Sequence, residues 1–169
     1  MEMDVLEKLS NIVLNNDNIH FPIASKKLYC DIINDDDIVP DIIKNEKYYI
    51  TFNELARGDL QQYFNNNKNN YEFILNSFQQ ILICILSSPL STNYPHQDVH
   101  ENNYLYHLIK PGGYIHYKIY DKDIYIKNIG ILWVIWDFGL IKKVNKETDK
   151  GKDYRLISDL YEIVIESFN

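Results

Sequence analysis

The fold class that the sequence predicts is α+β, and three observations support it. Apolar residues recur at helical spacing near the start of the chain, and a long apolar segment follows at 71–88. Short β-prone runs, broken by turn residues, fill the region from 104 to 136. Because helices and strands stand in separate blocks rather than alternating, the pattern favours α+β over a parallel βαβ fold.

The first half of the chain is expected to hold helices and one pair of strands. Residues 2–14 predict an amphipathic helix, since their apolar residues share one face: Val5, Leu6, Leu9, Ile12 and Val13. The runs 27–33 and 48–52 predict two strands. A short helix is expected after Gly58, and the helix over 71–88 is apolar on most sides and therefore expected to be buried.

The second half is expected to be rich in strands, at 104–109, 114–120, 124–127 and 131–136. Pro111, Gly112 and Gly113 predict a turn between the first two of these strands. A polar loop then leads to a last helix, expected over 154–168.

Composition excludes several classes of protein. A length of 169 residues suits one domain or one large lobe, and 46% hydrophobic residues can build a core. The net charge of −7 argues against a nucleic-acid partner, and the longest apolar run, at 81–86, is too short to span a membrane. The acidic N-terminus lacks the features of a secretory signal. Cys30 and Cys84 form no C-x-x-C pair, so a reducing, cytoplasmic location is expected.

Two short motifs carry the candidate chemistry. The segment 96–103 reads HQDVHENN, so Asp98 precedes Asn103 by five residues. Asp137 follows an apolar run and precedes Phe-Gly. Phosphoryl transfer from ATP requires a carboxylate near the acceptor hydroxyl and oxygen ligands for the metal ions that neutralise the phosphates. Asp98, Asn103 and Asp137 offer these groups.

With these motifs in this order, the chain resembles the protein-kinase-like superfamily. The segment 96–103 matches its catalytic loop H-x-D-x-x-x-x-N, and 137–139 matches its D-F-G motif. The resemblance implies that Asp98 is the catalytic base, and that Asn103 and Asp137 bind Mg²⁺ (or Mn²⁺) together with ATP. It places His100 near the transferred phosphate. The segment 112–139 is also similar to kinase-like proteins of giant DNA viruses.

The resemblance extends to the nucleotide site and to the domain organisation. It implies that Glu54 and Leu55 lie in the hinge that meets adenine, and that Asp59 approaches the ribose. It implies a remnant of the N-terminal lobe at 1–55 and a C-terminal lobe at 56–169. It also assigns structural roles at the site to four residues: Glu2, His96, Phe138 and Gly139.

The chain departs from the family pattern in ways that affect the expected activity. Neither a Gly-rich loop nor the ATP-anchoring Lys precedes the helix that begins at Glu2, so the resemblance implies an N-terminally truncated kinase. Gln97 replaces the usual Arg, and no A-P-E-like segment is present to seat a peptide. Asp98 and Asp137 are 39 residues apart, which implies an extra β-hairpin at about 111–127.

Three functions remain open from the sequence. The first is an ATP-dependent phosphotransferase, acting on a protein or a small molecule, that is weakly active or inactive unless another chain supplies the missing strands. The second is a kinase-like binding module, or pseudokinase. The third is a metal-dependent hydrolase that holds zinc or manganese with His96, Asp98 and His100. Pro95 and the Asn pair at 102–103 predict a loop, which disfavours the third function.

Overall fold

The computed structural model of the chain describes residues 2–31, 47–92, 96, 98, 100–119 and 122–140. Three α-helices lie within these residues, α1 (Glu2–Leu14), α2 (Leu60–Asn67) and α3 (Tyr71–Thr92), together with the short 3-10 helix η2 (Glu101–Asn103). The described strands are β1 (Ala24–Asp31), β2 (Lys47–Asn53), β3 (Gly58–Asp59), β4 (Tyr104–Leu108), β5 (Tyr114–Ile119), β6 (Lys122–Lys127) and β7 (Ile131–Ile135).

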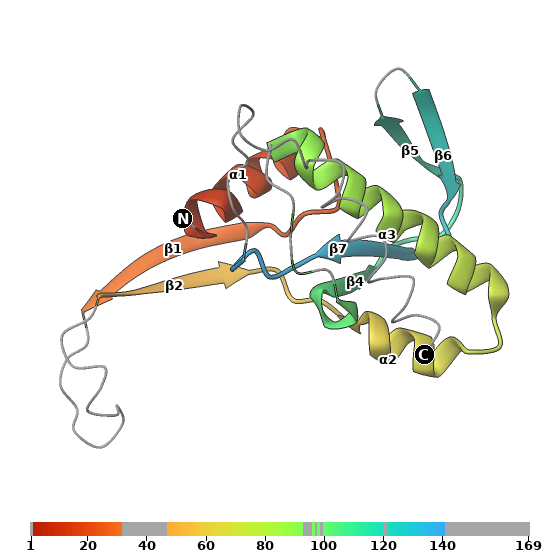
Figure 1. The fold of residues 1–169 in the computed structure, drawn as a ribbon, viewed down its shortest axis with the longest axis horizontal. Coiled ribbons are helices and arrows are strands. Elements are labelled where there is room, and N and C mark those ends of the chain that lie inside the picture. The colour runs from red at the N-terminus through yellow and green to blue at the C-terminus, as the bar shows by residue number, and fades with distance from the viewer. Residues whose placement is uncertain are drawn as a thin grey trace.

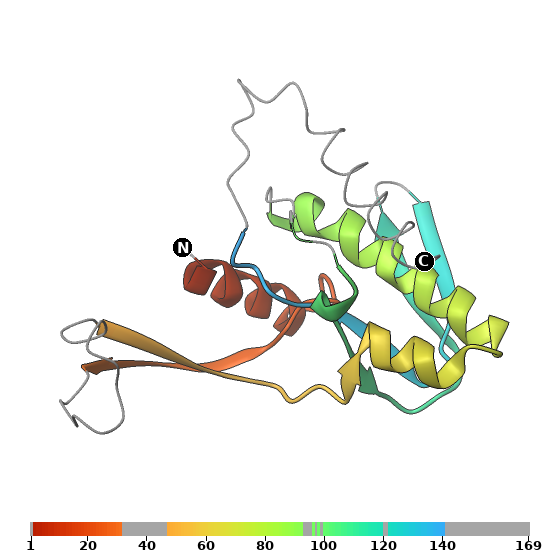
Figure 2. The same ribbon diagram turned by 60° about the horizontal axis from the view of Figure 1, so that its bottom comes forward.

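The strands form three small antiparallel sheets. β1 pairs with β2, β4 lies between β3 and β7, and β5 pairs with β6. In Figure 1 the β1–β2 ribbon extends away from the body of the molecule, and the β5–β6 hairpin stands at the opposite side. Figure 2 shows the same separation after rotation. The architecture is therefore mixed α+β, as the sequence predicts.

One apolar core joins the three described α-helices to strands β4 and β7. α1 contributes Val5, Leu6 and Leu9, while α2, α3, β4 and β7 supply most of the remainder. Trp133 of β7 is fully buried at the centre, where its ring meets Tyr63 of α2 and Tyr106 of β4. A second, smaller cluster lies under the β5–β6 hairpin and consists of Ile83, Tyr117 and Ile126, with Ile115 packed against it.

The outer edge of β7 is satisfied by side chains and by a turn. The Gln80 amide on α3 donates to the Ile131 carbonyl (3.0 Å) and accepts from the Trp133 N–H (3.2 Å). His20 donates from its ring to the Trp133 carbonyl (2.5 Å), and its own carbonyl accepts from the Ile135 N–H (3.0 Å). A buried strand edge needs such partners, since each unpaired backbone group costs free energy. These contacts fix β7 between β4 and α3.

Several sequence predictions are confirmed. The first helix covers 2–14, the strand pair is β1 and β2, and a short helix begins just after Gly58. The extra hairpin expected at about 111–127 is present as β5 and β6. The helix expected over 154–168 lies outside the described residues.

One boundary needs correction, because the long helix does not end at residue 88 but continues to Thr92.

Pro111, Gly112 and Gly113 separate β4 from β5, but these two strands do not pair, since β4 pairs with β3 and β7. Instead Gly112 and Gly113 exchange backbone hydrogen bonds with Asn128 and extend the stem of the β5–β6 hairpin. Both glycines have positive φ (120° and 68°), which favours glycine.

No helix within the described ranges combines the length and the apolarity that crossing a membrane requires. The division into 1–55 and 56–169 stays a prediction. Residues of α1 and of α2 nevertheless share the same core cluster.

Candidate functional site

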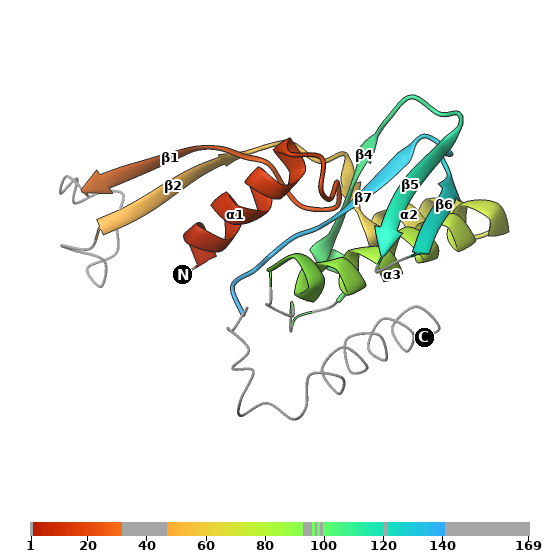
Figure 3. The ribbon, with the colours of Figure 1, turned by 90° about the horizontal axis from the view of Figure 1, so that it is seen from above.

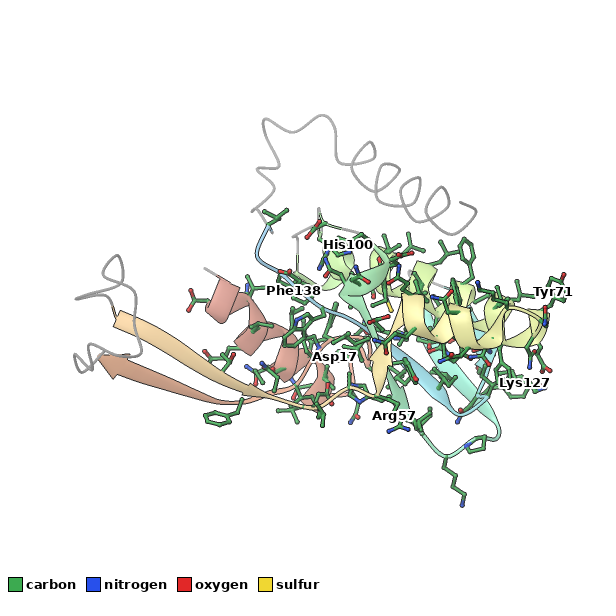
Figure 4. The ribbon with its side chains drawn as sticks, turned by 90° about the horizontal axis from the view of Figure 1, so that it is seen from below. Asp17, Arg57, Tyr71, His100, Lys127 and Phe138 are labelled. Atoms are coloured by element: carbon green, nitrogen blue, oxygen red, sulfur yellow. The ribbon has the colours of Figure 1, made fainter. Side chains whose placement is uncertain are left out.

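The two motifs lie next to each other because hydrogen bonds join their backbones. The His96 ring donates from Nε2 to the Trp136 carbonyl (2.7 Å), and the Trp136 N–H donates to the Asn103 carbonyl (2.7 Å). The loop that begins at His96 is therefore held at both of its ends against the residues that follow β7. Figure 4 marks the two segments by His100 and Phe138.

Asn103 holds the loop in a closed shape. Its side-chain nitrogen donates to the backbone carbonyl of Asp98 (2.9 Å) and contacts the Asp98 carboxylate Oδ2 (3.2 Å). Its own N–H donates to the His100 carbonyl (3.0 Å), which closes the single turn of η2. Asn103 is buried, while Asp98 is half-buried. Both side-chain contacts of Asn103 use its nitrogen, so its oxygen is the atom that could meet a cation.

Asp137 and Phe138 face opposite environments. Asp137 is exposed and has φ 60°, a left-handed conformation that Asp adopts more readily than most residues. Its Oδ1 accepts from the Gly139 N–H (3.1 Å), and a Cβ added at Gly139 would lie 3.1 Å from that same oxygen. Phe138 is 1% exposed and packs edge-on against the rings of His96 and Phe21. The chain therefore turns sharply after β7 and presents the carboxylate to solvent.

The pKa of His96 reflects its burial and the polar groups around its ring. Burial lowers the pKa of His96 below its ordinary value. The hydrogen bond to the Trp136 carbonyl opposes this shift, and so do the charge and the backbone of Asp98 and the charge of Asp137. Because the Trp136 carbonyl can only accept, the neutral ring carries its proton on Nε2.

His100 lies in the same loop, near Asp98 and partly exposed to solvent. Its Nε2 is 3.7 Å from the Asp98 Oδ2, and its side chain is 38% exposed. This separation is longer than a hydrogen bond, so the imidazole remains available to another partner.

The segment predicted to meet adenine and ribose lies after β2. The Glu54 carboxylate accepts from the Ile23 N–H (3.1 Å) and lies 3.7 Å from His107 Nε2. Leu55 is 94% exposed. Asp59 caps α2, because its Oδ1 accepts from the Gln62 N–H (2.8 Å). These contacts give Glu54 and Asp59 local structural roles. Their roles in binding a nucleotide stay predictions.

Glu2 is the first residue of α1, and only its backbone is described. Its predicted role at the site therefore stays a prediction. The same holds for the role of Gln97, which lies outside the described residues.

Sequence reasoning missed one contact of the loop. Gln61 of α2 donates from Nε2 to the Glu101 carboxylate (2.8 Å), which ties η2 to the first turn of α2. No local sequence pattern predicts this pair, since the two residues are 40 positions apart. Among the described residues, no group of three or more His, Cys, Asp and Glu side chains is arranged to hold a metal ion. Comparison with protein-family models and with curated proteins finds no match to this chain.

Proposed function

We propose that the chain is a protein-kinase-like phosphotransferase module that binds ATP with Mg²⁺ or Mn²⁺ and is weakly active or inactive alone. The observation that carries this proposal is the pair of hydrogen bonds between the loop from His96 to Asn103 and the backbone of Trp136. They bring a carboxylate, an amide and a second carboxylate to neighbouring segments. Such a set suits phosphoryl transfer, which depends on position and charge more than on covalent chemistry.

Each residue has a defined part in this proposal. The Asp98 carboxylate accepts the proton of the acceptor hydroxyl, and Asn103 orients it through the contact with Oδ2. The oxygens of Asn103 and Asp137 bind the divalent cation, which neutralises phosphate charge when bound. His100 lies 3.7 Å from Asp98 and contacts the transferred phosphate. The backbone near Glu54 and Leu55 receives the adenine, and Asp59 the ribose.

The low activity is proposed for residues 1–169 by themselves. In the family a Gly-rich loop and a Lys on a neighbouring strand hold the phosphates, and neither pattern is found within residues 1–169. Loss of one preorganised charge at a transferring group costs roughly 3–4 kcal/mol of transition-state stabilisation, by analogy with oxyanion donors. A partner chain that supplies these strands would restore activity. Without such a partner the chain is a nucleotide-binding module.

The geometry disfavours a zinc or manganese hydrolase built on His96, Asp98 and His100. The His96 Nε2 is already engaged by the Trp136 carbonyl, and the ring is 1% exposed. A metal ion would have to displace that hydrogen bond or enter the core.

Calorimetry with Mg-ATP tests the proposed site. Wild-type protein should bind Mg-ATP, and Asp137→Ala should weaken binding at least about tenfold, or about 1.4 kcal/mol, through the lost metal ligand. Asp123→Ala is the matched control, because Asp123 lies on the β5–β6 hairpin and its contact is with His116. Phosphate transfer from labelled ATP to generic acceptors, with Asp98→Asn as a comparison, should be low for the chain alone.

Each contrary outcome has a distinct meaning. Equal affinity of wild type and Asp137→Ala would place the nucleotide elsewhere. Strong transfer that Asp98→Asn abolishes would keep the site but overturn the expected inactivity. Tight zinc binding that depends on His96 and His100 would favour the hydrolase.

A further inference from the structure

His20 lies in the turn between α1 and β1, where its fully buried side chain contacts two other elements, β7 and β5. Its ring Nδ1 is 2.5 Å from the Trp133 carbonyl of β7, and its Nε2 is 2.9 Å from the Tyr117 hydroxyl of β5. The rings of His20 and Tyr117 are stacked with centroids 5.2 Å apart. His20 therefore joins the turn, β7 and the β5–β6 hairpin at one point.

The two hydrogen bonds determine the protonation state of the ring. A carbonyl can only accept, so Nδ1 carries the proton and donates to Trp133. In the neutral ring Nε2 is then the acceptor, and the Tyr117 hydroxyl donates to it. The neutral imidazole satisfies both partners.

Within the described part of the chain, the two hydrogen-bond partners of this ring are uncharged at neutral pH, namely the Trp133 carbonyl of β7 and the Tyr117 hydroxyl of β5. The Cys84 thiol of α3 lies 3.8 Å from the same carbonyl. Burial raises the pKa of both Tyr117 and Cys84, so neither supplies a negative charge. A protonated His20 would be a buried cation without a carboxylate among these neighbours. Burial accordingly lowers the pKa of His20 to about 4.

The hairpin that covers His20 is attached to the body by a small interface. Its buried apolar residues form the separate cluster of Ile83, Tyr117 and Ile126, distinct from the main core. Two polar contacts with α3 add to it, from Asn76 to the Lys127 carbonyl (2.7 Å) and from Lys127 to Glu72 (2.5 Å). Figure 3 shows the hairpin alongside α3, and Figure 4 shows Lys127 at the same end of the molecule as Tyr71. Detaching the hairpin would open only the smaller cluster.

We propose that His20 is an acid-sensitive latch, which holds the β5–β6 hairpin against α3 and β7 at neutral pH and releases it when the imidazole is protonated. In the released state the ring is exposed to water, and its pKa returns to the ordinary value for histidine. The Tyr117 hydroxyl can rotate to accept from a protonated ring, so the driving force is hydration of the cation rather than loss of that hydrogen bond.

The size of the effect follows from proton linkage. A pKa of about 4 in the closed state and 6.5 in the open state raises the open fraction roughly 30-fold between pH 7.5 and pH 5. The hairpin can open in this way while the main core stays closed, since its buried apolar residues form a separate cluster.

Amide hydrogen exchange at pH 7.5 and pH 5, expressed as protection factors, measures this release. Protection in β5 and β6 should fall roughly 30-fold in wild type and should stay below that of the amides of α3 and β4 at both pH values, because the hairpin opens without the main core. His20→Gln should remove the pH dependence. His116→Gln is the matched control, since His116 lies on the exposed outer face of the same hairpin and should leave the dependence unchanged.

A second measurement on wild-type protein needs no substitution. Nitrogen-15 spectra of the His20 imidazole should show the neutral form with the proton on Nδ1 at pH 7.5. A protonated His20 beneath a fully protected hairpin at pH 5 would overturn the proposal. Hairpin protection that does not change with pH would also overturn it, and so would equal protection of the hairpin, α3 and β4 at both pH values or a pH dependence that persists in His20→Gln.

Discussion

A single imidazole, His96, connects the candidate catalytic loop to the end of β7. Its Nε2 donates to the Trp136 carbonyl, and its ring packs edge-on against Phe138, with centroids 4.9 Å apart. The packing orients the residue that follows Asp137, while the hydrogen bond fixes the loop that carries Asp98. One side chain therefore sets the relative position of both carboxylates.

Replacing His96 by Phe should separate these two contributions. Phe keeps an aromatic ring beside Phe138 but leaves the Trp136 carbonyl without its partner. We expect a loss of about 1–3 kcal/mol in the free energy of unfolding, measured by urea denaturation, with weaker Mg-ATP binding. His116→Phe is the control, because His116 is half-exposed and stacks on Tyr125, and it should change stability by less than about 0.5 kcal/mol. Equal losses in the two variants would contradict a special role for His96.

At the scale of elements, β7 depends on α3 as well as on its partner strand β4. The Gln80 side chain takes the place of a neighbouring strand, since its amide meets both the Ile131 carbonyl and the Trp133 N–H. Gln80 is fully buried, and it also donates to Asn76, which in turn donates to the Lys127 carbonyl of β6. One polar chain on α3 thus supports both β7 and the hairpin.

Gln80→Leu should therefore destabilise the protein although Leu fits an apolar environment. The substitution leaves two backbone groups of β7 buried without partners, at a cost of about 2–4 kcal/mol in the free energy of unfolding. Gln79→Leu is the matched control, because Gln79 is the preceding residue of α3 and is exposed. It should shift the urea midpoint little, within about 0.5 kcal/mol. If both variants unfold at the same urea concentration, the strand edge does not depend on Gln80.

At the scale of the whole molecule, two buried histidines make stability depend on pH. Burial lowers the pKa of His20 to about 4 and also lowers that of His96. The unfolded chain, where histidine titrates near 6.5, therefore binds more protons than the folded chain below neutrality. The two neutral histidines therefore leave the free energy of unfolding at its full value above pH 6.5. The free energy of unfolding decreases as the pH falls from 6.5 toward the folded-state pKa values.

We expect the free energy of unfolding to decrease by about 2 kcal/mol between pH 7.5 and pH 5 through His20 alone, with a further decrease through His96. Urea denaturation at several pH values across this range measures the slope. A stability that is constant or rises toward pH 5 would mean that neither imidazole is neutral and buried in the folded protein.

Local pattern alone determined the class of fold and most of its elements. Helical spacing of apolar residues predicts α1, β-prone runs predict most of the strands, and the 39-residue separation of Asp98 and Asp137 implies the hairpin of β5 and β6. The motif residues Asp98, Asn103 and Asp137 were also visible, because their spacing is short within each motif. These features depend on residues that are close together in the chain.

Tertiary structure decided how strands pair and which polar groups are buried. β4 pairs with β7 and not with β5, because Gly112 and Gly113 turn into the hairpin stem instead of reversing the chain. His20 looks like an ordinary turn residue in the sequence, yet it meets Tyr117 and Trp133 across 97 and 113 positions. Packing buries the Trp133 carbonyl, and a buried backbone group needs a hydrogen-bond partner. Which residue provides that partner depends on which side chain lies nearby in space, and the local sequence does not show this.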